Sequence, residues 1–181
     1  MRFLMNLELK RFVERNADER AAYQQLAALV YPPEELATMP ERDIVWAAVE
    51  WSVMVWNDGQ LVSHVGVVTR NVKLEGRAVH IGGIGGVMTH PDARGRGYAS
   101  AGMKRATTLL AGELDAAFGL LVCPPAVEGF YARLGWRRFG GKLLVEQHGA
   151  TVEYIASVPM LLALREHGPE IGEINLLGLP W

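Results

Sequence analysis

The chain has 181 residues, of which 50% are hydrophobic and 21% are charged, and its formal net charge is -2. This length predicts one domain, residues 1–181, with a sizeable core, and the near-neutral charge argues against nucleic acid as a partner. The single cysteine excludes an internal disulfide. With no signal peptide and no apolar run of about twenty residues, we expect a cytoplasmic protein without a membrane span.

Hydrophobic periodicity predicts seven strands, in chain order at residues 4–12, 51–56, 61–72, 78–88, 118–123, 136–146 and 151–158. Helical spacing and helix caps predict helices at residues 18–30, 97–114 and 127–134, with one or two short helices within 34–48. We expect Asp18 to cap the first of these helices. Asp58-Gly59 lies between two apolar runs and predicts a hairpin turn, and His148-Gly149 predicts another turn. The tail after Pro159 is expected to be less regular.

The order of these elements predicts a mixed α/β sheet in which most neighbouring strands are antiparallel. One parallel pair is expected, strands 78–88 and 118–123, because the helix at 97–114 joins them as a right-handed crossover. The run 118–123 is apolar throughout, which is typical of a strand buried on both faces. Parallel strands that diverge at their carboxyl ends leave a slot where ligands bind, so we expect the functional site there.

The segment between strand 78–88 and the helix at 97–114 carries the most informative pattern, Val87-Met88-Thr89-His90-Pro91-Asp92-Ala93-Arg94-Gly95-Arg96-Gly97-Tyr98-Ala99. Unpaired N–H groups at the start of the helix, together with the positive end of the helix dipole, attract a phosphate. Gly95 and Gly97 have no Cβ atom to keep a ligand from the backbone, and Arg94 and Arg96 add positive charge. The pattern is neither the P-loop nor Gly-x-Gly-x-x-Gly, and it predicts a diphosphate-bearing cofactor. The alternative is an ordinary strand-to-helix turn that contains two glycines.

Two blocks of the sequence resemble one enzyme family. The pattern Arg94-x-x-Gly97-x-Ala99 resembles the pyrophosphate-binding signature of the GNAT superfamily of acetyl-coenzyme A-dependent N-acetyltransferases. The block Phe130-Tyr131-Ala132-Arg133-Leu134-Gly135-Trp136 is similar to the GNAT segment in which a helix carrying Phe-Tyr closes on Gly followed by an aromatic residue. The blocks and the element order together cover about residues 50–158. The resemblance implies the GNAT fold, a mixed sheet with one parallel pair splayed for coenzyme A, and acetyl-CoA as the cosubstrate.

Within the superfamily, the chain is most similar to the aminoglycoside 2′-N-acetyltransferases. The segments 61–65 and 84–87, the latter followed by residues 92–95, carry this likeness, and the chain ends in a tryptophan, Trp181, as those enzymes do. In that family the free terminal carboxylate lies close to the substrate amine. At the position of Gly85, however, those enzymes have a strand glutamate that helps to accept the proton. Either the base here comes from elsewhere or the substrate differs.

The resemblance also implies roles for individual residues. The implied cofactor-binding residues are Val87, Met88, Thr89, Arg94, Gly95, Arg96, Gly97, Tyr98 and Ala99. A backbone N–H in the bulged strand near Val87 would bond to the thioester carbonyl, and Thr89 would bind the pantetheine arm. Tyr131 is the expected general acid, because a phenol with a pKa of about 10 can donate a proton to a thiolate with a pKa of about 8.5. The alternative for Val87 and Tyr131 is a packing role alone.

The proton acceptor is the least determined part of the site. The Trp181 carboxylate completes the predicted catalytic set of Tyr131, Val87 and Trp181. Other groups that remain open for this role are Glu153, Glu173, His64 and His80. We expect Cys123 to be a small buried hydrophobic residue and not a nucleophile, because no histidine is near it in sequence. No metal site is predicted.

The expected function is N-acetylation of a small amine by direct attack on the thioester, with aminoglycosides as one candidate class. Acidic residues expected to border the acceptor side favour a cationic amine, namely Glu34, Glu35, Glu41, Asp43, Glu50, Glu128, Glu170 and Glu173. Two alternatives stay open: a protein or peptide N-acetyltransferase, and a non-catalytic module that binds acyl-CoA or a drug. The apolar tail 174–181 is expected to dock on the body of the protein or on a second copy in a homodimer.

Overall fold

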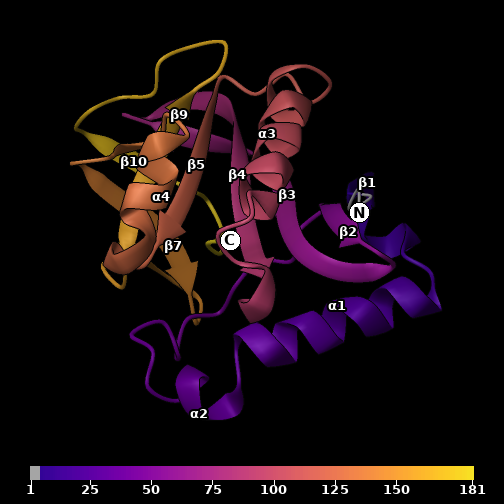
Figure 1. Cartoon of the computed structure of the whole chain (residues 1–181). Coiled ribbons are helices and arrows are strands. Elements are labelled where there is room, and N and C mark those ends of the chain that lie inside the picture. The colour runs from indigo at the N-terminus through magenta and orange to yellow at the C-terminus, as the bar shows by residue number, and fades with distance from the viewer. Residues whose placement is uncertain (1–4) are drawn as a thin grey trace.

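Ten strands form one sheet in the computed structural model, which describes residues 5–181 (Figure 1). In chain order they are β1 (Met5–Arg11), β2 (Trp51–Asn57), β3 (Gln60–Leu74), β4 (Arg77–Thr89), β5 (Phe118–Cys123), β6 (Arg137–Arg138), β7 (Lys142–Gln147), β8 (Ala150–Glu153), β9 (Val158–Ala163) and β10 (Glu173–Asn175). The helices are α1 (Ala17–Val30), α2 (Pro33–Leu36), α3 (Tyr98–Ala111) and α4 (Glu128–Arg133), with short 3-10 turns η1 (Phe12–Glu14), η2 (Pro91–Ala93) and η3 (Pro125–Val127). Leu4, where the first strand was predicted to begin, lies outside the described residues.

The long strands β3 and β4 form the centre of the sheet. β2 and then β1 extend it beyond β3, and β5, β9 and β6 follow β4 on the other side. β10 pairs with the end of β3 and continues the sheet into β7 and β8. The predicted parallel pair is β4 and β5, joined by α3, so the mixed, mostly antiparallel α/β fold is confirmed. A second parallel pair, β10 with β7, was not predicted.

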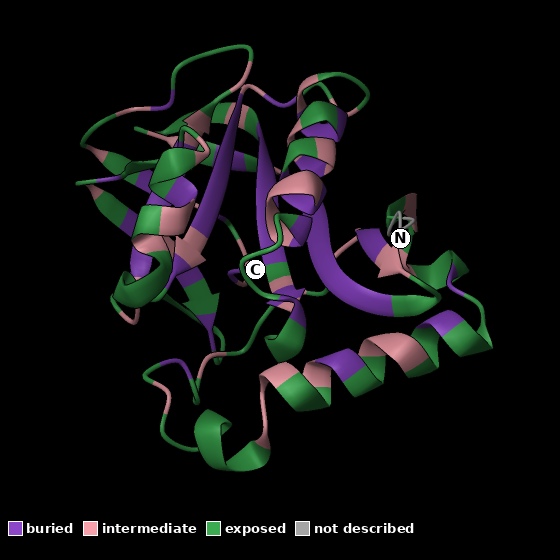
Figure 2. Ribbon diagram, in the orientation of Figure 1, coloured by how far each residue is buried: buried purple, intermediate pink, exposed green. Residues whose placement is uncertain are grey.

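β4 and β5 separate soon after they meet. In the described structure they pair at Gly82 with Gly119 and at Gly83 with Leu120, and their carboxyl ends then diverge (Figure 1). Figure 2 shows both strands buried where they lie side by side. The slot expected at this point of the sheet is therefore present.

Glycines in β4 allow side chains to approach both faces of the strand closely. A Cβ atom on Gly82 would lie 2.3 Å from Leu110 Cδ2 of α3, and one on Gly83 would lie 2.1 Å from Trp181 Cε2. Because successive residues of a strand point to opposite faces, α3 packs on one face of β4 and the chain end packs on the other. The two large hydrophobic clusters, one around α3 and one around Trp181, follow this division.

Two local predictions were tested at turns and caps. Asp58 and Gly59 have φ values of 50° and 80°, which confirms the hairpin turn between β2 and β3. The cap of α1 is Asn16 and not Asp18 as predicted. Asn16 accepts the backbone N–H of Glu19, and the Glu19 carboxylate accepts the backbone N–H of Asn16. This capping box satisfies two N–H groups at once, which determines where the helix begins.

The carboxyl-terminal third differs most from the prediction. The expected strand 136–146 is divided into β6 and β7, because Gly141 packs so closely on Gly172 that a Cβ there would lie 2.1 Å from its carbonyl oxygen. The expected strand 151–158 is also wrong, since β8 ends at Glu153 and β9 begins at Val158. The tail after Pro159 contains most of β9 and all of β10. Within 34–48, the short helix α2 ends at Leu36 and the rest is irregular. No helix among residues 5–181 is long and apolar enough to span a membrane.

Candidate active site

A β-bulge lies in β4 beside the slot. On β3 only Val65 lies between two paired positions, whereas on β4 both Gly86 and Val87 lie between their partners. Gly86 has a φ of 56°, a left-handed conformation that favours glycine, and such an extra residue bends a strand and redirects its peptide groups. The bulge that the family resemblance implied near Val87 is therefore present.

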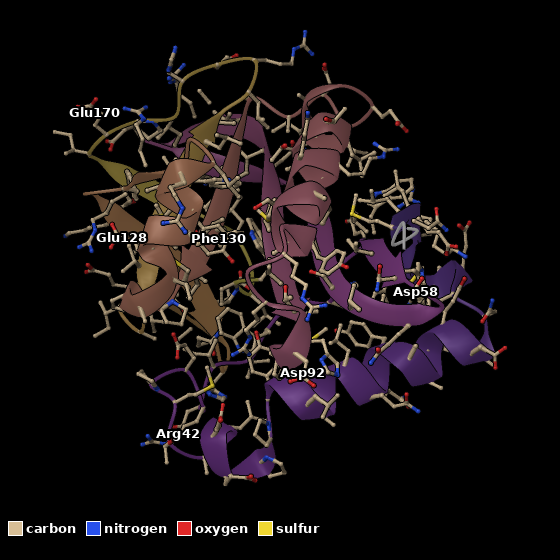
Figure 3. All side chains as sticks on the ribbon, in the orientation of Figure 1. Arg42, Asp58, Asp92, Glu128, Phe130 and Glu170 are labelled. Atoms are coloured by element: carbon tan, nitrogen blue, oxygen red, sulfur yellow. The ribbon has the colours of Figure 1, made fainter. Side chains whose placement is uncertain are left out.

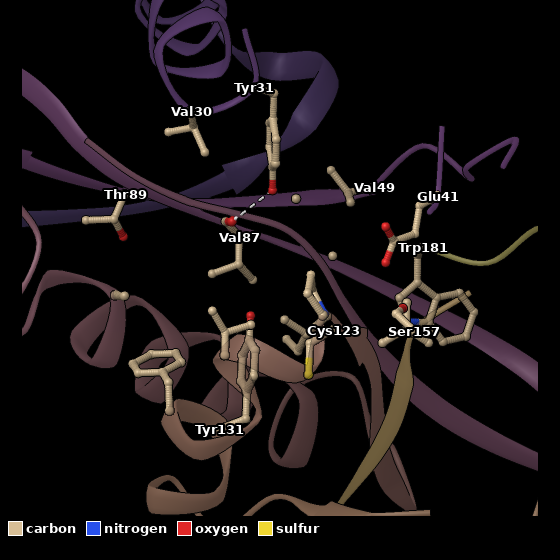
Figure 4. A pocket seen from close by; sticks show the side chains of 18 of the residues that line it. Val30, Tyr31, Glu41, Val49, Val87, Thr89, Cys123, Tyr131, Ser157 and Trp181 are labelled. Atoms are coloured by element: carbon tan, nitrogen blue, oxygen red, sulfur yellow. Dashed lines mark hydrogen bonds between the residues drawn. The ribbon is translucent and has the colours of Figure 1, made fainter. Parts of the chain in front are cut away.

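Side chains donate hydrogen bonds to three successive carbonyl groups at this bulge. These bonds are His64 Nδ1 to Gly86 O at 2.8 Å, Tyr31 Oη to Val87 O at 3.4 Å and Ser63 Oγ to Met88 O at 2.7 Å. The Tyr31 bond is drawn in Figure 4. Side chains from Tyr31, the residue that follows α1, and from β3 thus fix the backbone of β4 where it lines the slot.

The loop after β4 has the open backbone that the sequence predicted. Gly95 and Gly97 have φ values of 74° and 83°, and no atom lies within 4 Å of the place where a Cβ would be. Gly97 is the N-cap residue of α3, so the free N–H groups of the first helical turn begin here. Arg94 and Arg96 flank this loop and are exposed. The loop can therefore accept an anion from the solvent side.

One cavity of about 1230 Å³ connects these features. Its lining includes the bulge, the Gly95–Gly97 loop, α4, the segment after α2 and the chain end. Arg42 on that segment and Phe130 on α4 both border it (Figure 3). Pockets for single small ligands usually measure about 300–1,000 Å³, so this cavity has room for two molecules.

Tyr131 projects from α4 into the cavity (Figure 4). Burial raises the pKa of its hydroxyl, and the neighbouring Cys123 and Tyr31 raise it further, so the group is protonated at neutral pH. Cys123 is 2% exposed, and its Sγ donates a hydrogen bond to Met160 Sδ at 3.7 Å. Burial raises the pKa of this thiol to about 11, and a protonated thiol is a poor nucleophile. Cys123 is a buried structural residue, as predicted.

The C-terminal tail docks on the body of the protein. The Trp181 indole is 5% exposed, and its Nε1 donates to Leu120 O at 3.1 Å. The Arg70 guanidinium lies 4.9 Å from the centre of the indole ring and donates to Leu179 O at 2.7 Å. The backbone N–H of Ala47 donates to Pro180 O at 2.7 Å. These contacts fix the last residue between β4 and β5.

The carboxyl-terminal residue Trp181 lies against Gly85, the position at which this chain has no side chain that could accept a proton. A Cβ atom on Gly85 would lie 2.7 Å from the carboxyl carbon of Trp181. Trp181 and Gly85 both line the cavity. The absence of a side chain at Gly85 thus leaves the space that the Trp181 backbone occupies.

A model of the family described as "Acetyltransferase (GNAT) domain" matches residues 14–139. The chain belongs to the GNAT acetyltransferase family. GNAT membership makes it an acyltransferase. No curated protein sequence gives a significant match.

Solved structures agree with this GNAT assignment at the level of the fold. An acyl-CoA N-acyltransferase from Pseudomonas aeruginosa is 21% identical, with a TM-score of 0.60, over 88% of this chain and 100% of that one. A GNAT family N-acetyltransferase from Escherichia coli in complex with CoA is 16% identical, with a TM-score of 0.60, over 97% and 90%. A GNAT family acetyltransferase from Brucella melitensis in complex with acetyl-CoA is 17% identical, with a TM-score of 0.57, over 93% and 94%.

Most of the predicted site residues of this GNAT protein meet in the cavity. Its lining contains Val87, Thr89, Arg94, Gly95, Gly97, Tyr98, Ala99, Tyr131 and Trp181. Arg96 is exposed in the loop but does not line the cavity, and the Met88 side chain is 2% exposed and packs with Leu26 of α1. Their part in cofactor binding stays a prediction that rests on the Arg96 charge and on the Met88 backbone.

Within residues 5–181, Glu41 is the acidic residue of the predicted rim that lines the cavity. It is 9% exposed, and its Oε2 atom is buried without a hydrogen-bond partner. Figure 4 shows its carboxylate, like Trp181, among the side chains that line the cavity. Its negative charge contributes to the raised pKa values of Tyr31 and Tyr154, which places it near both phenols. Glu34, Glu35 and Asp43, by contrast, are exposed.

No site role is predicted for Tyr31 from the sequence, and His64 is predicted there only as one of several possible bases. Tyr31 follows the predicted helix 18–30 and precedes two prolines, and its hydroxyl reaches the Val87 carbonyl. His64 is wholly buried under the bulge. The sequence signal for both residues is a polar side chain within an otherwise apolar run. Such a side chain is often buried, and a buried polar group requires a hydrogen-bond partner.

Proposed function

We propose that this GNAT protein is an acetyl-CoA-dependent N-acetyltransferase that acts on a small cationic amine, and that residues 1–181 form one domain. One observation carries the proposal: the open loop, the bulge at Val87, Tyr131 and the end of the chain at Trp181 all line a single cavity. The presence of CoA and acetyl-CoA in two similar solved structures supports it. The residue roles below are part of the proposal, and a homodimer stays a prediction.

The loop would bind the cofactor through its diphosphate. The N–H groups at the start of α3 would donate to the phosphate oxygens, with Arg94 and Arg96 adding charge attraction. The pantetheine arm would follow the splayed end of β4 past Thr89. The thioester carbonyl would then accept a hydrogen bond from the Val87 N–H, which stabilises the oxyanion that forms on attack.

The reaction would proceed by direct transfer. The neutral amine nitrogen attacks the thioester carbon, a C–N bond forms, and the C–S bond breaks when the tetrahedral intermediate collapses. The departing sulfur takes the Tyr131 proton, giving the free thiol of CoA. The amide nitrogen releases one proton, which the Trp181 carboxylate accepts, and Tyr131 regains a proton from solvent. Holding amine and thioester together in one cavity contributes about 7–11 kcal/mol in well-oriented systems.

The carboxylates at one end of the cavity favour a cationic acceptor. Glu41 is buried and has an oxygen without a partner, and such a group gains most from an ammonium that supplies both charge and hydrogen bonds. Trp181 closes the same end of the cavity, which favours a small molecule over a peptide chain. Aminoglycosides and polyamines are the two compound classes that combine these properties, and both belong in the first test.

The test is a panel of amines with acetyl-CoA, followed by release of free thiol. We expect turnover with at least one aminoglycoside or polyamine and less with neutral peptides that carry one free amine. Turnover confined to peptides would replace the proposal by a peptide N-acetyltransferase. Calorimetric binding of CoA without turnover of any amine would replace it by a non-catalytic binding module. Failure to bind CoA at millimolar concentration would refute the cofactor assignment.

A variant pair tests the acceptor site separately. Glu41→Gln should raise KM for a diamine about 10- to 100-fold, since hydrogen bonds to charged groups contribute about 1.5–3 kcal/mol. The affinity for CoA should not change. The matched control is Glu35→Gln, which removes an exposed carboxylate on α2 and should leave both constants unchanged. Equal KM values for Glu41→Gln and the wild type would remove Glu41 from acceptor binding.

A further inference from the structure

His64 is a buried, titratable residue to which the reaction described above gives no role. It lies on β3 directly beneath the bulge and is 0% exposed. Its Nδ1 is 2.8 Å from the Gly86 carbonyl oxygen, and its Nε2 is 3.0 Å from Ser52 Oγ on β2. The edge of the Tyr23 ring packs against the imidazole, with ring centres 4.8 Å apart.

These two hydrogen bonds determine the tautomer of the ring. A carbonyl oxygen can only accept, so Nδ1 carries the hydrogen and donates it to Gly86. Burial lowers the pKa of His64 to about 4, so the ring is neutral near pH 7 and Nε2 has a lone pair. Nε2 therefore accepts the hydroxyl hydrogen of Ser52. In this orientation of the ring, each nitrogen has a hydrogen-bond partner.

The Gly86 carbonyl and the Val87 N–H belong to the same peptide group. A trans peptide is planar, and its C=O and N–H point in opposite directions. A donor that holds the carbonyl on the side of β3 therefore directs the N–H away from β3. The Gly86 backbone has a left-handed conformation and few steric restraints, because even a Cβ atom at this position would have no neighbour closer than 3.8 Å. The orientation of this peptide depends on its hydrogen bonds.

We propose that His64 is a positioning residue of the acetyl transfer: it holds the Gly86 carbonyl so that the Val87 N–H points at the thioester oxygen. The inference rests on the proposed function, in which the Val87 N–H donates a hydrogen bond to the thioester carbonyl. A bonded carbonyl also makes the N–H of its own peptide a somewhat stronger donor, as hydrogen bonds in a chain polarise one another. Ser52 acts through His64 by fixing the ring.

The first test does not depend on activity. The ¹⁵N chemical shifts of the His64 ring, measured by NMR on the wild-type protein near neutral pH, report which nitrogen carries the hydrogen. We expect the Nδ1–H form and a coupling across the hydrogen bond to the Gly86 carbonyl carbon. An Nε2–H tautomer would overturn the proposal, because that ring could not donate to Gly86.

The second test separates positioning from folding. His64→Leu removes the donor, whereas His64→Asn places an amide near the position of Nδ1 and His64→Gln places one near Nε2. We expect kcat to fall about 10- to 100-fold in the Leu and Gln variants, somewhat less than the loss of an oxyanion-hole donor, and to recover in large part with Asn. The Kd for CoA and the KM for the amine should stay within about threefold, since the N–H acts mainly on the transition state. His148→Asn, which changes an exposed histidine in the turn between β7 and β8, is the matched control.

Three outcomes would overturn the assignment: an unchanged kcat in His64→Leu and His64→Gln, equal kcat values for Asn and Gln, or a loss of CoA binding as large as the loss of kcat. If the Leu variant does not fold, the Asn and Gln pair and the ring shifts still decide. A wild-type protein that binds CoA but acetylates no amine would refute the proposed function, while the ring shifts would still report the hydrogen bond.

Discussion

Protonation of His64 should make the protein markedly less stable in mild acid. The folded-state pKa of this histidine is lowered from 6.5 to about 4, mainly by burial. The nearby Arg15 charge lowers the pKa further, whereas the bond to Gly86 raises it. The unfolded chain therefore takes up the proton first as the pH falls. The stabilising contribution is complete above the unfolded pKa and is lost between pH 6.5 and about 4.

The size of the effect follows from the two pKa values. Between about pH 7.5 and pH 4.5 the linkage amounts to about 2.5 kcal/mol, at 1.36 kcal/mol for each unit of pKa difference. The assay is urea unfolding at a series of pH values, for the wild type and for His64→Asn, which does not titrate. All other titrating groups are shared, so the difference between the two curves isolates His64. Curves that stay parallel within about 0.5 kcal/mol would refute the reasoning that this ring is held neutral by burial.

Three further predictions concern the site. Tyr131→Phe should lower kcat about 100-fold with little change in CoA affinity, as expected for a general acid, and an unchanged kcat would remove Tyr131 from that role. A protein ligated to an amidated C-terminal peptide keeps the Trp181 indole and loses only its charge. Its kcat/KM for the amine should fall at least tenfold relative to the same ligation product with a free carboxylate, and an equal fall in CoA binding would indicate a structural role. Gly83→Ala should destabilise the fold by about 1–3 kcal/mol, measured by urea unfolding, because its Cβ would lie 2.1 Å from the Trp181 ring. Gly129→Ala on α4, where the nearest atom is 3.8 Å away, should cost nothing measurable and serves as its control.

The open loop before α3 could be predicted from the sequence, because it lies within one continuous segment. Residues 87–99 contain the end of β4, the open loop and the start of α3. The glycines of this segment indicate its open backbone, and the arginines indicate its positive charge. The meeting of residues from separate segments could not be predicted in this way. Glu41, His64 and Trp181 were candidates from the sequence, but only the fold brings Glu41 and Trp181 into one cavity and His64 under the bulge.

Local rules also failed where long-range contacts determined the structure. Hydrophobic periodicity predicts a continuous strand at 136–146, but in the fold β6 pairs with β9 whereas β7 pairs with β8 and β10, and Gly141 between them packs closely on Gly172. β10 contains only Glu173–Asn175, which is too short to show a period, and it forms because both β3 and β7 offer it partners. Asn16 caps α1 because Glu19 completes the capping box, a signal that was present in the sequence and was missed.

The sequence by itself determined the family, the order of strands and helices around the slot, and the loop that opens at Arg94, because each depends on neighbours in the chain. Only the tertiary structure decided that the end of the folded tail, at Trp181, packs against Gly85 of β4. Gly85 has no side chain, and the folded tail brings the Trp181 carboxyl carbon to 2.7 Å from where a Cβ would be. No local pattern links residues 85 and 181, since their contact exists only when the tail packs between β4 and β5.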